Sequence, residues 1–422
     1  MKTVAVIGGG PAGLCAARHL LQSKLKPIVF EQQDCVGGTW VYQDVDKNNS
    51  KDVFSSLYDN MRTNLPRQVM EFPDYPFDDD YPTFLHHTAV RKYIECYAEH
   101  FKLYPHIRFN MRVTSVLPSQ MKSIENSFIK WRVQSQNLMQ DNHVTEEFDA
   151  VVVCNGHSSQ PRYPTIKGLD NFNGEIIHSH YYRRQSDFAK KTVLVLGAGP
   201  SGRDISLELA TTCERIYLSH RGERIEAELP SNVIEVCDID FVSQDGSFVF
   251  KDGSLAAAHV LLLCTGYKYA FPFLNSESGI CVADGVVKTL YKHLFNIKYP
   301  SMSFVGLPFK CTPLPMFHQQ CAYLASVYSG KKTLPSTEEM SADTEKEKAK
   351  KLTFGIPERY FHQMGIEQFS YNDELAEMSG NNRNAEVIKD LYIYNSTVRR
   401  KNLQHYKNCS YRVLNNKEFE VL

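Results

Sequence analysis

The chain has 422 residues, 42% of them hydrophobic, and a formal net charge of -1 at neutral pH. This length allows two or three ordinary domains with a buried core. The near-zero charge excludes the electrostatic footprint of a partner such as nucleic acid or an anionic membrane, and it favours a neutral or weakly charged small-molecule substrate.

The 11 cysteines are spread without C-x-x-C spacing or paired clusters. This pattern argues against a zinc site, a redox dithiol and a secreted disulfide scaffold, so we expect no metal and a reducing cytoplasm. No apolar run approaches the roughly 20 residues that span a bilayer, and we expect a soluble protein without a membrane anchor. The amino terminus enters a strand within three residues, so a secreted protein would require a presequence that has been removed.

The first predicted unit begins with a short apolar strand at residues 4–7 that runs into a glycine loop. In the order G-x-G-x-x-G, the three glycines permit a tight turn, a close approach of backbone to a pyrophosphate, and packing of the following helix on the strand. The loop comprises Gly8, Gly9, Gly10, Pro11, Ala12 and Gly13. A second strand at residues 27–30 ends at Glu31, 18 residues after Gly13, where a carboxylate binds ribose hydroxyls in such units.

Two short motifs follow this unit. Gly37 and Gly38 precede Thr39 and Trp40, so backbone can pass close to a flat ligand beside an aromatic wall. Residues 63–66 read Thr-Asn-Leu-Pro, and the proline stiffens the backbone after the asparagine. Taken alone, Asn64 is more often a local cap than a functional residue.

The stretch after these motifs predicts an enlarged first unit. Residues 75–81 are aromatic, acidic and rich in proline, which fits a loop that lines or covers a pocket equally as well as a solvated loop. Residues 87–101 have the spacing of an amphipathic helix, and residues 107–116 and 128–133 alternate as strands. Residues 149–154 form an apolar strand that runs directly into Asn155 and Gly156.

A second glycine loop follows the strand at residues 193–196, and it comprises Gly197, Gly199, Pro200, Ser201 and Gly202. The next strand, residues 215–219, ends in His220 and Arg221 rather than in an acid, and Arg221 lies 19 residues after Gly202. A cation there suits a ribose 2′-phosphate, which an acid would repel. This predicts NADP(H) at the second loop and the unphosphorylated ribose of FAD at the first.

An apolar strand at residues 259–264, followed by Gly266, repeats the order found at residues 149–156. The predicted fold is therefore α/β, with two dinucleotide-binding (Rossmann-like) domains, the NADP domain inserted into the FAD domain. We expect the first part of the FAD domain at 1–165, the NADP(H) domain at 166–268, and the second part of the FAD domain with the C-terminal region at 269–422. Ligands should lie at the carboxyl ends of the parallel strands.

The remaining chain is less informative. Residues 303–307 predict a strand and turn, residues 318–328 a helix, and the mixed charges at 336–351 a solvated helix face. The tail to Leu422 is moderately apolar and is expected to be packed.

With both loops placed, the chain resembles the flavin-containing monooxygenases. Their pattern F-x-G-x-x-x-H-x-x-x-Y/F is matched by Phe172, Gly174, His178 and Tyr182, directly before the second glycine loop. The resemblance covers roughly the first 320 residues. The sequence has no counterpart of the apolar C-terminal anchor of the longer vertebrate members. Among the short soluble enzymes, it is similar first to the insect (pyrrolizidine) alkaloid N-oxygenases and next to the plant thioether S-oxygenases.

The resemblance implies an FAD enzyme that uses NADPH and O2, forms a C4a-hydroperoxyflavin and oxygenates a soft nucleophile. The implied substrate is a neutral tertiary amine or alkaloid, giving an N-oxide, with a thioether as the alternative. Asn64 resembles the active-site asparagine of the family, whereas a motif histidine such as His178 is more often a structural hydrogen-bonding hub. Further cofactor contacts implied by the resemblance are Thr63, Val113 and Asp204.

Other readings stay open at this point. Baeyer-Villiger relatives usually have Trp and then Pro or Asp where this chain has Tyr182 and Arg183, which disfavours ketone insertion. A flavoprotein disulfide reductase needs a cysteine pair beside the flavin, and none is spaced for it. A non-catalytic NADP(H)-sensing flavoprotein should have a damaged flavin site, against which Trp40 and Asn64 argue. The oligomeric state is left open, a homo-oligomer included.

Overall fold

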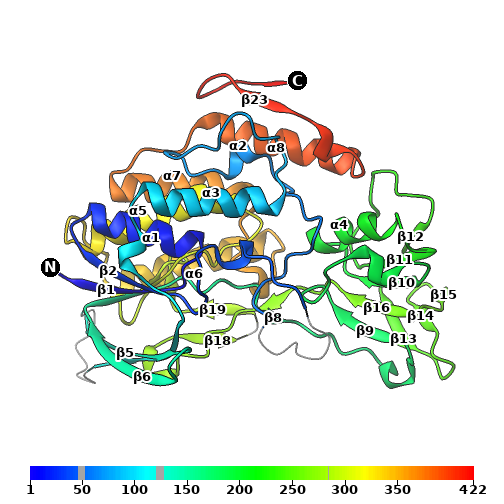
Figure 1. The fold of residues 1–422 in the computed structure, drawn as a ribbon, viewed down its shortest axis with the longest axis horizontal. Helices are drawn as coiled ribbons and strands as arrows, with labels where there is room; N and C mark the ends of the chain where they lie inside the picture. Colours follow the sequence, from blue (N-terminus) through cyan, green and yellow to red (C-terminus); the bar gives the residue numbers. More distant parts are fainter. Residues whose placement is uncertain (46–52, 120–127, 284) are drawn as a thin grey trace.

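Two sheets organise the protein, one parallel throughout and one parallel except for its β20–β21–β22 end, and each is built around a strand that ends in a glycine loop. The structure is a computed structural model that describes residues 1–45, 53–119, 128–283 and 285–422. Figure 1 shows the first sheet under a stack of helices on the left and the second sheet, with its small antiparallel sheet, on the right.

The first sheet has the strand order β20-β21-β22-β7-β1-β2-β3. Strand β1 pairs in parallel with β2 on one side and β7 on the other. All four residues of β7 are buried, which is the expected pattern for a parallel strand covered on both faces. The strands are β1 (Thr3–Ile7), β2 (Lys26–Phe30), β3 (Ile107–Arg108), β7 (Ala150–Val153), β20 (Leu290–Tyr291), β21 (Phe295–Asn296) and β22 (Met302–Phe304).

The second sheet has the order β12-β11-β10-β16-β9 and is parallel throughout. Its strands are β9 (Glu175–His178), β10 (Thr192–Leu196), β11 (Arg215–Ser219), β12 (Val233–Val236) and β16 (Val260–Leu263). A small antiparallel sheet packs against one face of β10 and β16 and contains β13 (Ile239–Val242), β14 (Phe248–Phe250) and β15 (Leu255–Ala256).

The two units repeat one another in detail. Helix α1 (Pro11–Gln22) follows the loop after β1, and helix α4 (Pro200–Leu209) follows the loop after β10. The backbone amide of Cys154 donates to the carbonyl of Ile7, and that of Cys264 donates to Leu196, both at 2.9 Å. Because the chain returns to the first sheet at β20–β22 after the second sheet is complete, the predicted insertion of one Rossmann-like unit into the other is confirmed.

The segment between the units differs from the prediction. The expected strand at 107–116 is split, because Asn110 has a φ of 55° and turns the chain. Residues before the turn form β3 in the parallel sheet, and residues after it form β4 (Met111–Pro118). The next strand, β5 (Trp131–Asn137), lies later than expected, and β6 (Asn142–Phe148) was missed because most of its side chains are exposed and polar.

The loop at 75–81 divides into aromatic side chains that pack inward and residues 78–80, which are exposed. Tyr75 packs against the rings of Tyr93, Tyr97 and Phe101, and the rings of Phe77 and Tyr93 stack with centroids 3.8 Å apart. Tyr93 and Tyr97 belong to helix α3 (His87–His100), which has the predicted position. These aromatic side chains therefore pack into the core, and the suggestion that the loop lines a substrate pocket stays a prediction.

The C-terminal third is largely helical. Helix α5 begins at Pro313, earlier than the predicted 318, because a proline is tolerated in the first turn where no intrahelical N–H bond is needed. Its helices are α5 (Pro313–Tyr328), α6 (Thr337–Thr353), α7 (Gln368–Ser379) and α8 (Glu386–Lys401), whereas the short helix α2 (Arg67–Met70) precedes α3 in the first unit. The remaining strands are β8 (Gln160–Pro161), β17 (Tyr267–Lys268), β18 (Cys281–Ala283), β19 (Val286–Lys288), β23 (Tyr411–Val413) and β24 (Phe419–Val421).

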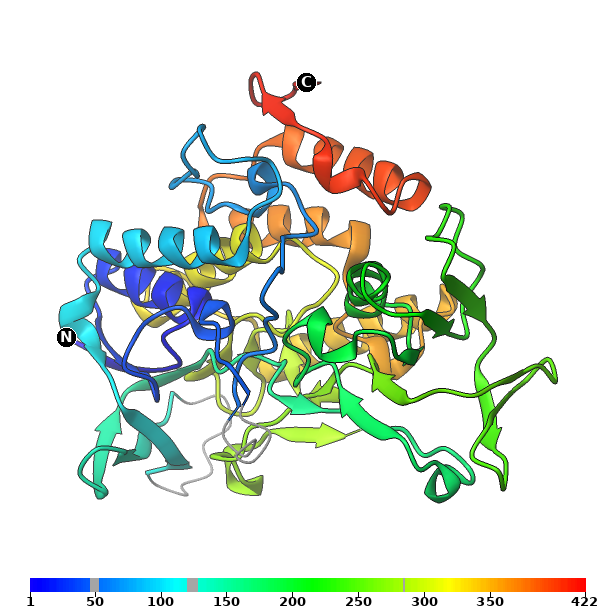
Figure 2. The same ribbon diagram turned by 45° about the vertical axis from the view of Figure 1, so that its right-hand side comes forward.

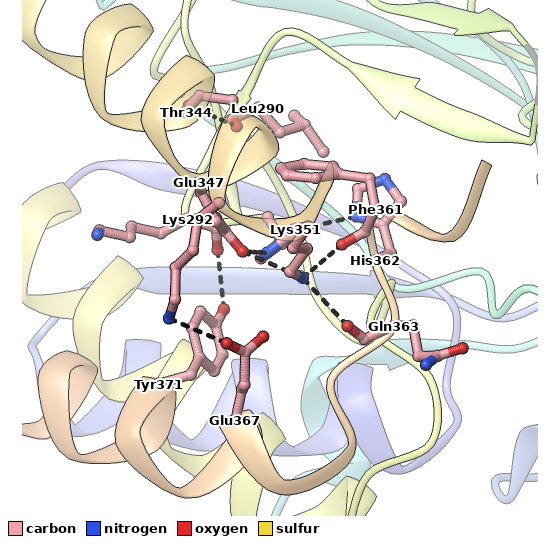
Figure 3. Close-up of polar contacts among 12 residues, drawn as sticks. Leu290, Lys292, Thr344, Glu347, Lys351, Phe361, His362, Gln363, Glu367 and Tyr371 are labelled. Atoms are coloured by element: carbon pink, nitrogen blue, oxygen red, sulfur yellow. Dashed lines mark hydrogen bonds and ion pairs between the residues drawn. The ribbon is translucent and has the colours of Figure 1, made fainter. Parts of the chain in front are cut away.

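Helix α6 carries one charge that is not solvated, contrary to expectation. Lys351 is 3% exposed, and its Nζ donates to the carbonyls of Phe361 at 2.6 Å and Gln363 at 3.1 Å. Glu347, one turn earlier, accepts from Lys351 at 3.2 Å (Figure 3). The lysine thus ties α6 to the segment before α7. In the described ranges, no helix combines the length and apolar character needed to cross a membrane.

Candidate functional site

The first glycine loop has a backbone that only glycine can form. Gly8 has a φ of 110°, and a Cβ there would lie 2.5 Å from the carbonyl oxygen of Cys154. A Cβ on Gly13 would lie 1.8 Å from the oxygen of Gly8. The sequence motif therefore corresponds to a real steric requirement at the carboxyl end of β1.

Glu31 lies at the end of β2, as predicted, and faces this loop. Its Oε2 accepts a hydrogen bond from the Gly9 amide at 2.6 Å, and its Oε1 accepts one from the Gln33 amide at 2.8 Å. The residue is 6% exposed, and burial raises the pKa of the Glu31 carboxyl although both amide donors oppose the shift. The carboxylate therefore holds the loop as well as standing where a ribose would bind.

Gly37 and Gly38 pack on the first glycine loop. The amide of Gly37 donates to the carbonyl of Gly9 at 3.2 Å, and a Cβ on Gly38 would lie 3.0 Å from the Cα of Gly10. Thr39 is exposed and its carbonyl accepts from Ser55, while Trp40 is half-buried against the core. The structure thus brings residues 8–13 and 37–40 together at one edge of the first sheet.

Both glycine loops fit a phosphate group. Helices α1 and α4 begin at Pro11 and Pro200, and their N-cap residues, Gly10 and Gly199, provide no side-chain cap. First-turn amides left without a cap, together with the helix dipole, form an anion site at the carboxyl end of a parallel sheet. This is the arrangement that a dinucleotide pyrophosphate requires.

The Asn64 segment is held by its neighbour. Thr63 is 3% exposed; its amide donates to the Leu85 carbonyl at 2.7 Å, and its hydroxyl accepts from the Leu85 amide at 2.9 Å. Asn64 itself is half-buried, and its side chain makes no hydrogen bond with any described residue. A fixed backbone with an unsatisfied amide fits a ligand-binding role for Asn64, whereas Thr63 has a scaffolding role.

The second loop opens into a cavity of about 950 Å³. Gly197 and Gly199 line it, and a Cβ added to Gly199 would meet no atom within 4 Å, so the loop faces open space. Seven basic side chains also line the cavity: Arg162, Arg203, His220, Arg221, Arg224, Lys310 and Arg400. Four acids, Glu223, Glu226, Asp238 and Asp240, line it as well, and the six Arg and Lys side chains leave a positive excess that fits an anionic dinucleotide.

The two residues predicted to bind the 2′-phosphate have different environments. Arg221 is 70% exposed, and its closest ionic partner, Asp238, is 3.8 Å away and also pairs with Lys251. His220 has a fixed ring, because its Nδ1 accepts from the Gly222 amide at 3.2 Å and its Nε2 donates to Glu235 at 2.7 Å. His220 therefore orders the turn, and Arg221 remains available to a phosphate.

Sequence reasoning missed Arg203, the residue directly after the third glycine of the second loop. It lines the cavity, and its Nε is buried without a hydrogen-bond partner among the described residues. Burial lowers the pKa of its guanidinium, and nearby Arg399 adds to the effect. A half-buried cation with an unsatisfied donor beside a glycine loop fits an anionic ligand, and its position one residue after Gly202 was the available signal.

Four other predicted contacts have different environments. Asp204 is ion-paired with Lys407 at 2.7 Å and does not line the cavity, although it lies only two residues after Gly202. Val113 is 8% exposed and packs in an apolar cluster with Ile7 and Phe30. Pro200 and Ser201 are exposed at the start of α4.

The motif residues before the second loop form a structural junction. A Cβ on Gly174 would lie 2.3 Å from the Phe172 ring and 2.5 Å from the His259 carbonyl. His178 accepts from the His180 amide at 3.1 Å, so its other ring nitrogen donates to the Gly266 carbonyl at 3.2 Å. Burial lowers the pKa of His178 to about 4. A neutral ring bonded to backbone at both nitrogens is the hub that was expected.

Arg183, the residue after the motif tyrosine, joins the two units. It is 3% exposed and donates to the carbonyls of Gln43, Ser55, His180 and Tyr182 at 2.6 to 2.8 Å. Gln43 and Ser55 belong to the first unit, while His180 and Tyr182 begin the second. Four of the five N–H groups of the guanidinium therefore donate to backbone carbonyls, which gives Arg183 a structural role.

Comparisons with known proteins identify the family. The family described as flavin-binding monooxygenase-like matches residues 1–230 and 225–390. Flavin-containing monooxygenase FMO GS-OX-like 4 of Arabidopsis thaliana is 38% identical, over 96% of this chain and 93% of that protein. The structure of S-allyl-L-cysteine S-oxygenase from Allium sativum superposes with a TM-score of 0.89 at 36% identity, over 96% of this chain and 95% of that one.

A third relative is Tmm from Pelagibacter sp., with a TM-score of 0.84 and 26% identity over 96% of this chain and 93% of that one. The matches extend into the last hundred residues, in which the sequence showed no recognisable motif. The chain therefore belongs to the flavin-containing monooxygenase family, whose cofactors are FAD and NADPH.

Proposed function

We propose that this monooxygenase transfers one oxygen atom of O2 to a soft, uncharged nucleophile, with a thioether sulfur as the first candidate and a tertiary amine nitrogen as the second. The observation that carries the proposal is the pair of glycine loops in one chain. The first loop is hydrogen-bonded to the carboxylate of Glu31, and the second opens into the cavity lined by Arg203 and Arg221. Two cofactors of different charge can be held by these two loops.

The residues assigned to each cofactor follow from the site. FAD is proposed to bind at residues 8–13, Glu31, residues 38–40, Thr63, Asn64 and Val113. NADPH is proposed to bind at residues 197–202, His220 and Arg221, with Arg203 added. When bound, FAD that has been reduced by NADPH supplies the activation of O2.

The protein's own task is to hold the two cofactors and to keep water away. Asn64 is proposed to be the catalytic residue, because its free amide can both donate and accept a hydrogen bond beside the flavin. Proximity and exclusion of water decide whether oxygen reaches the substrate or is lost as hydrogen peroxide. The domain division at 1–165, 166–268 and 269–422 is proposed on the sheet memberships described above.

Sulfur is placed first because a relative that is 36% identical over 96% of this chain is named an S-oxygenase. Sequence resemblance alone had placed the alkaloid nitrogen first. A thioether is uncharged at every pH, whereas an amine must lose its proton before its lone pair can react. We also propose a cytoplasmic location, since all 11 cysteines are free.

The deciding experiment compares a thioether with a tertiary amine of the same shape, each at a series of pH values, with NADPH consumption, oxygenated product and hydrogen peroxide measured together. Product from the thioether with a flat pH profile is expected. For the amine, kcat/KM should rise with pH toward the amine's own pKa. Product from a ketone alone would contradict the proposal, and a yellow protein that NADPH does not bleach under nitrogen would indicate a non-catalytic flavoprotein.

A further inference from the structure

The last part of the chain, in which the sequence showed no motif, lies across both nucleotide-binding units. Figures 1 and 2 show helix α8 and the β23–β24 hairpin running over one end of the molecule, from α2 toward α4. On the side of the first unit, Gln68 donates to the carbonyl of Tyr411 at 2.6 Å, and the Tyr411 amide donates to Thr83 at 3.0 Å. On the other side, Gln404 donates to the Glu228 carbonyl at 2.9 Å.

Lys407, between these anchors, contacts both units with a single ammonium group. Its Nζ lies 2.7 Å from the Asp204 carboxylate and 3.2 Å from the carbonyl oxygen of Arg62. Arg62 returns the contact, since its Nη2 donates to the Lys407 carbonyl at 2.8 Å. The hydroxyl of Tyr58 is 3.5 Å from the same Asp204 oxygen.

This ion pair differs from an ordinary surface pair. The side chains of Lys407 and Asp204 are only 19% and 14% exposed. Exposed pairs contribute little because solvent screens them and free side chains lose entropy when they pair. Here the lysine is also bound to backbone, and it lies beside an apolar seam in which Phe84 of the first unit, Ala227 of the second and Tyr406 of the C-terminal segment are packed together.

The two partners of Lys407 are close in sequence to the two proposed cofactor sites. Arg62 precedes Asn64 by two residues, and Asp204 follows Gly202 by two residues. Lys407 therefore connects the backbone that carries the proposed catalytic amide to the helix that begins at the NADPH loop. Neither partner lines the cavity, so the lysine acts through them and not on a ligand.

We propose that Lys407 is a positioning residue that sets the distance between the second unit and the Asn64 segment, and so aligns NADPH with the flavin for hydride transfer. The inference rests on the proposed cofactor sites. Hydride transfer oxidises NADPH to NADP+ and reduces FAD, and its rate depends on sub-ångström alignment of donor and acceptor. The same contact explains why Asp204 follows the glycine loop without facing the cofactor.

The test uses Lys407→Met in the holoenzyme, because methionine keeps the length of the side chain and removes its charge. The loss of flavin absorbance under nitrogen at saturating NADPH gives the rate of reduction, and titration gives the Kd for NADPH. We expect the rate to fall about tenfold or more while FAD content and the Kd stay unchanged. Lys407→Arg should retain most of the rate, because it restores the charge.

A second readout does not depend on turnover. Hydrogen exchange measured without NADPH should become faster at residues 60–65 and at the start of α4 in Lys407→Met. Lys417→Met is the matched control, since Lys417 lies in the same tail, is 71% exposed and is 3.7 Å from Glu386. It should change neither readout.

Asp204→Asn removes the same ion pair from the other side and carries the test if Lys407→Met does not fold. A reduction rate and exchange pattern equal to wild type would overturn the inference, as would a lower melting temperature with an unchanged rate. Failure of the proposed function looks different, because NADPH would then not reduce the flavin of the wild-type protein either.

Discussion

The Oε2 atom of Glu31 accepts a 2.6 Å hydrogen bond from the backbone amide of Gly9, so the carboxylate at the end of β2 is bonded directly to the loop at the end of β1. In the second unit, the equivalent strand ends in His220 and Arg221, whose side chains leave the loop open toward a basic cavity. The difference between these two strand ends is the structural basis for assigning a different cofactor to each unit.

Glu31→Gln is expected to weaken FAD binding by about tenfold or more. The amide replaces one acceptor with an NH2 group, which would face the donor amide of either Gly9 or Gln33. Fluorescence titration of the apoprotein with FAD measures the change. Glu147→Gln, at an exposed position of β6, is the control, and equal FAD affinity in both variants would contradict the role of Glu31.

Arg221→Ala is expected to raise the KM for NADPH about ten- to a hundredfold while leaving the KM for NADH nearly unchanged, since the lost contact is to the 2′-phosphate. At 70% exposure and 3.8 Å from Asp238, the guanidinium has no strong partner to lose, so the fold should be unaffected. Steady-state kinetics with both coenzymes give the ratio. Arg412→Ala, exposed and paired with Glu420, should leave that ratio at the wild-type value.

Asn64→Leu should separate reduction from oxygenation. Leucine has a similar size but cannot hydrogen-bond, so FAD should stay bound and NADPH should still bleach it, while product falls to a small fraction of the wild-type amount and hydrogen peroxide rises in its place. Product and peroxide are measured in one reaction. Asn142→Leu, at the exposed start of β6, is the comparison, and normal product from the Asn64 variant would remove Asn64 from the mechanism.

Glu347 should make stability depend on acid pH. Its contacts with His293 at 2.9 Å and Lys351 at 3.2 Å overcome burial and lower the pKa of the carboxyl from 4.5 to about 2. A folded pKa below the unfolded value stabilises the protein above pH 4.5, and this stabilisation is lost as the pH falls from 4.5 toward 2. The contribution at neutral pH is roughly 2 to 3 kcal/mol.

Urea unfolding at several pH values tests this expectation. The difference in unfolding free energy between wild type and Glu347→Gln should shrink as the pH falls through that window. Glu345→Gln is the control, because Glu345 lies on the same helix, pairs with Lys348 and has a side chain that is 69% exposed. It should show a small difference in unfolding free energy at every pH. A constant difference for Glu347→Gln would mean that the ion pairs do not titrate with the fold.

The sequence by itself determined the two glycine loops and the type of fold around them. Gly8 and Gly197 have φ values of 110° and 109°, and a Cβ on either would lie 2.5 Å from a carbonyl oxygen of the neighbouring strand. Such a position excludes every residue that has a side chain, so glycine marks it in the sequence even though the carbonyl it approaches is distant along the chain. Apolar parallel strands beside them left equally clear runs, as in β7 and β16.

Tertiary structure alone decided features that depend on a distant partner. The charge of Lys351 reads as solvated until the carbonyls of Phe361 and Gln363 are brought to it. Lys407 is 203 residues from Asp204 in sequence, and nothing local to either residue indicates the other. A lysine or an aspartate is compatible with solvent as well as with an ion pair, so the neighbouring sequence does not indicate which of the two it has. Only the packing of the C-terminal segment over both units brings Lys407 and Asp204 together.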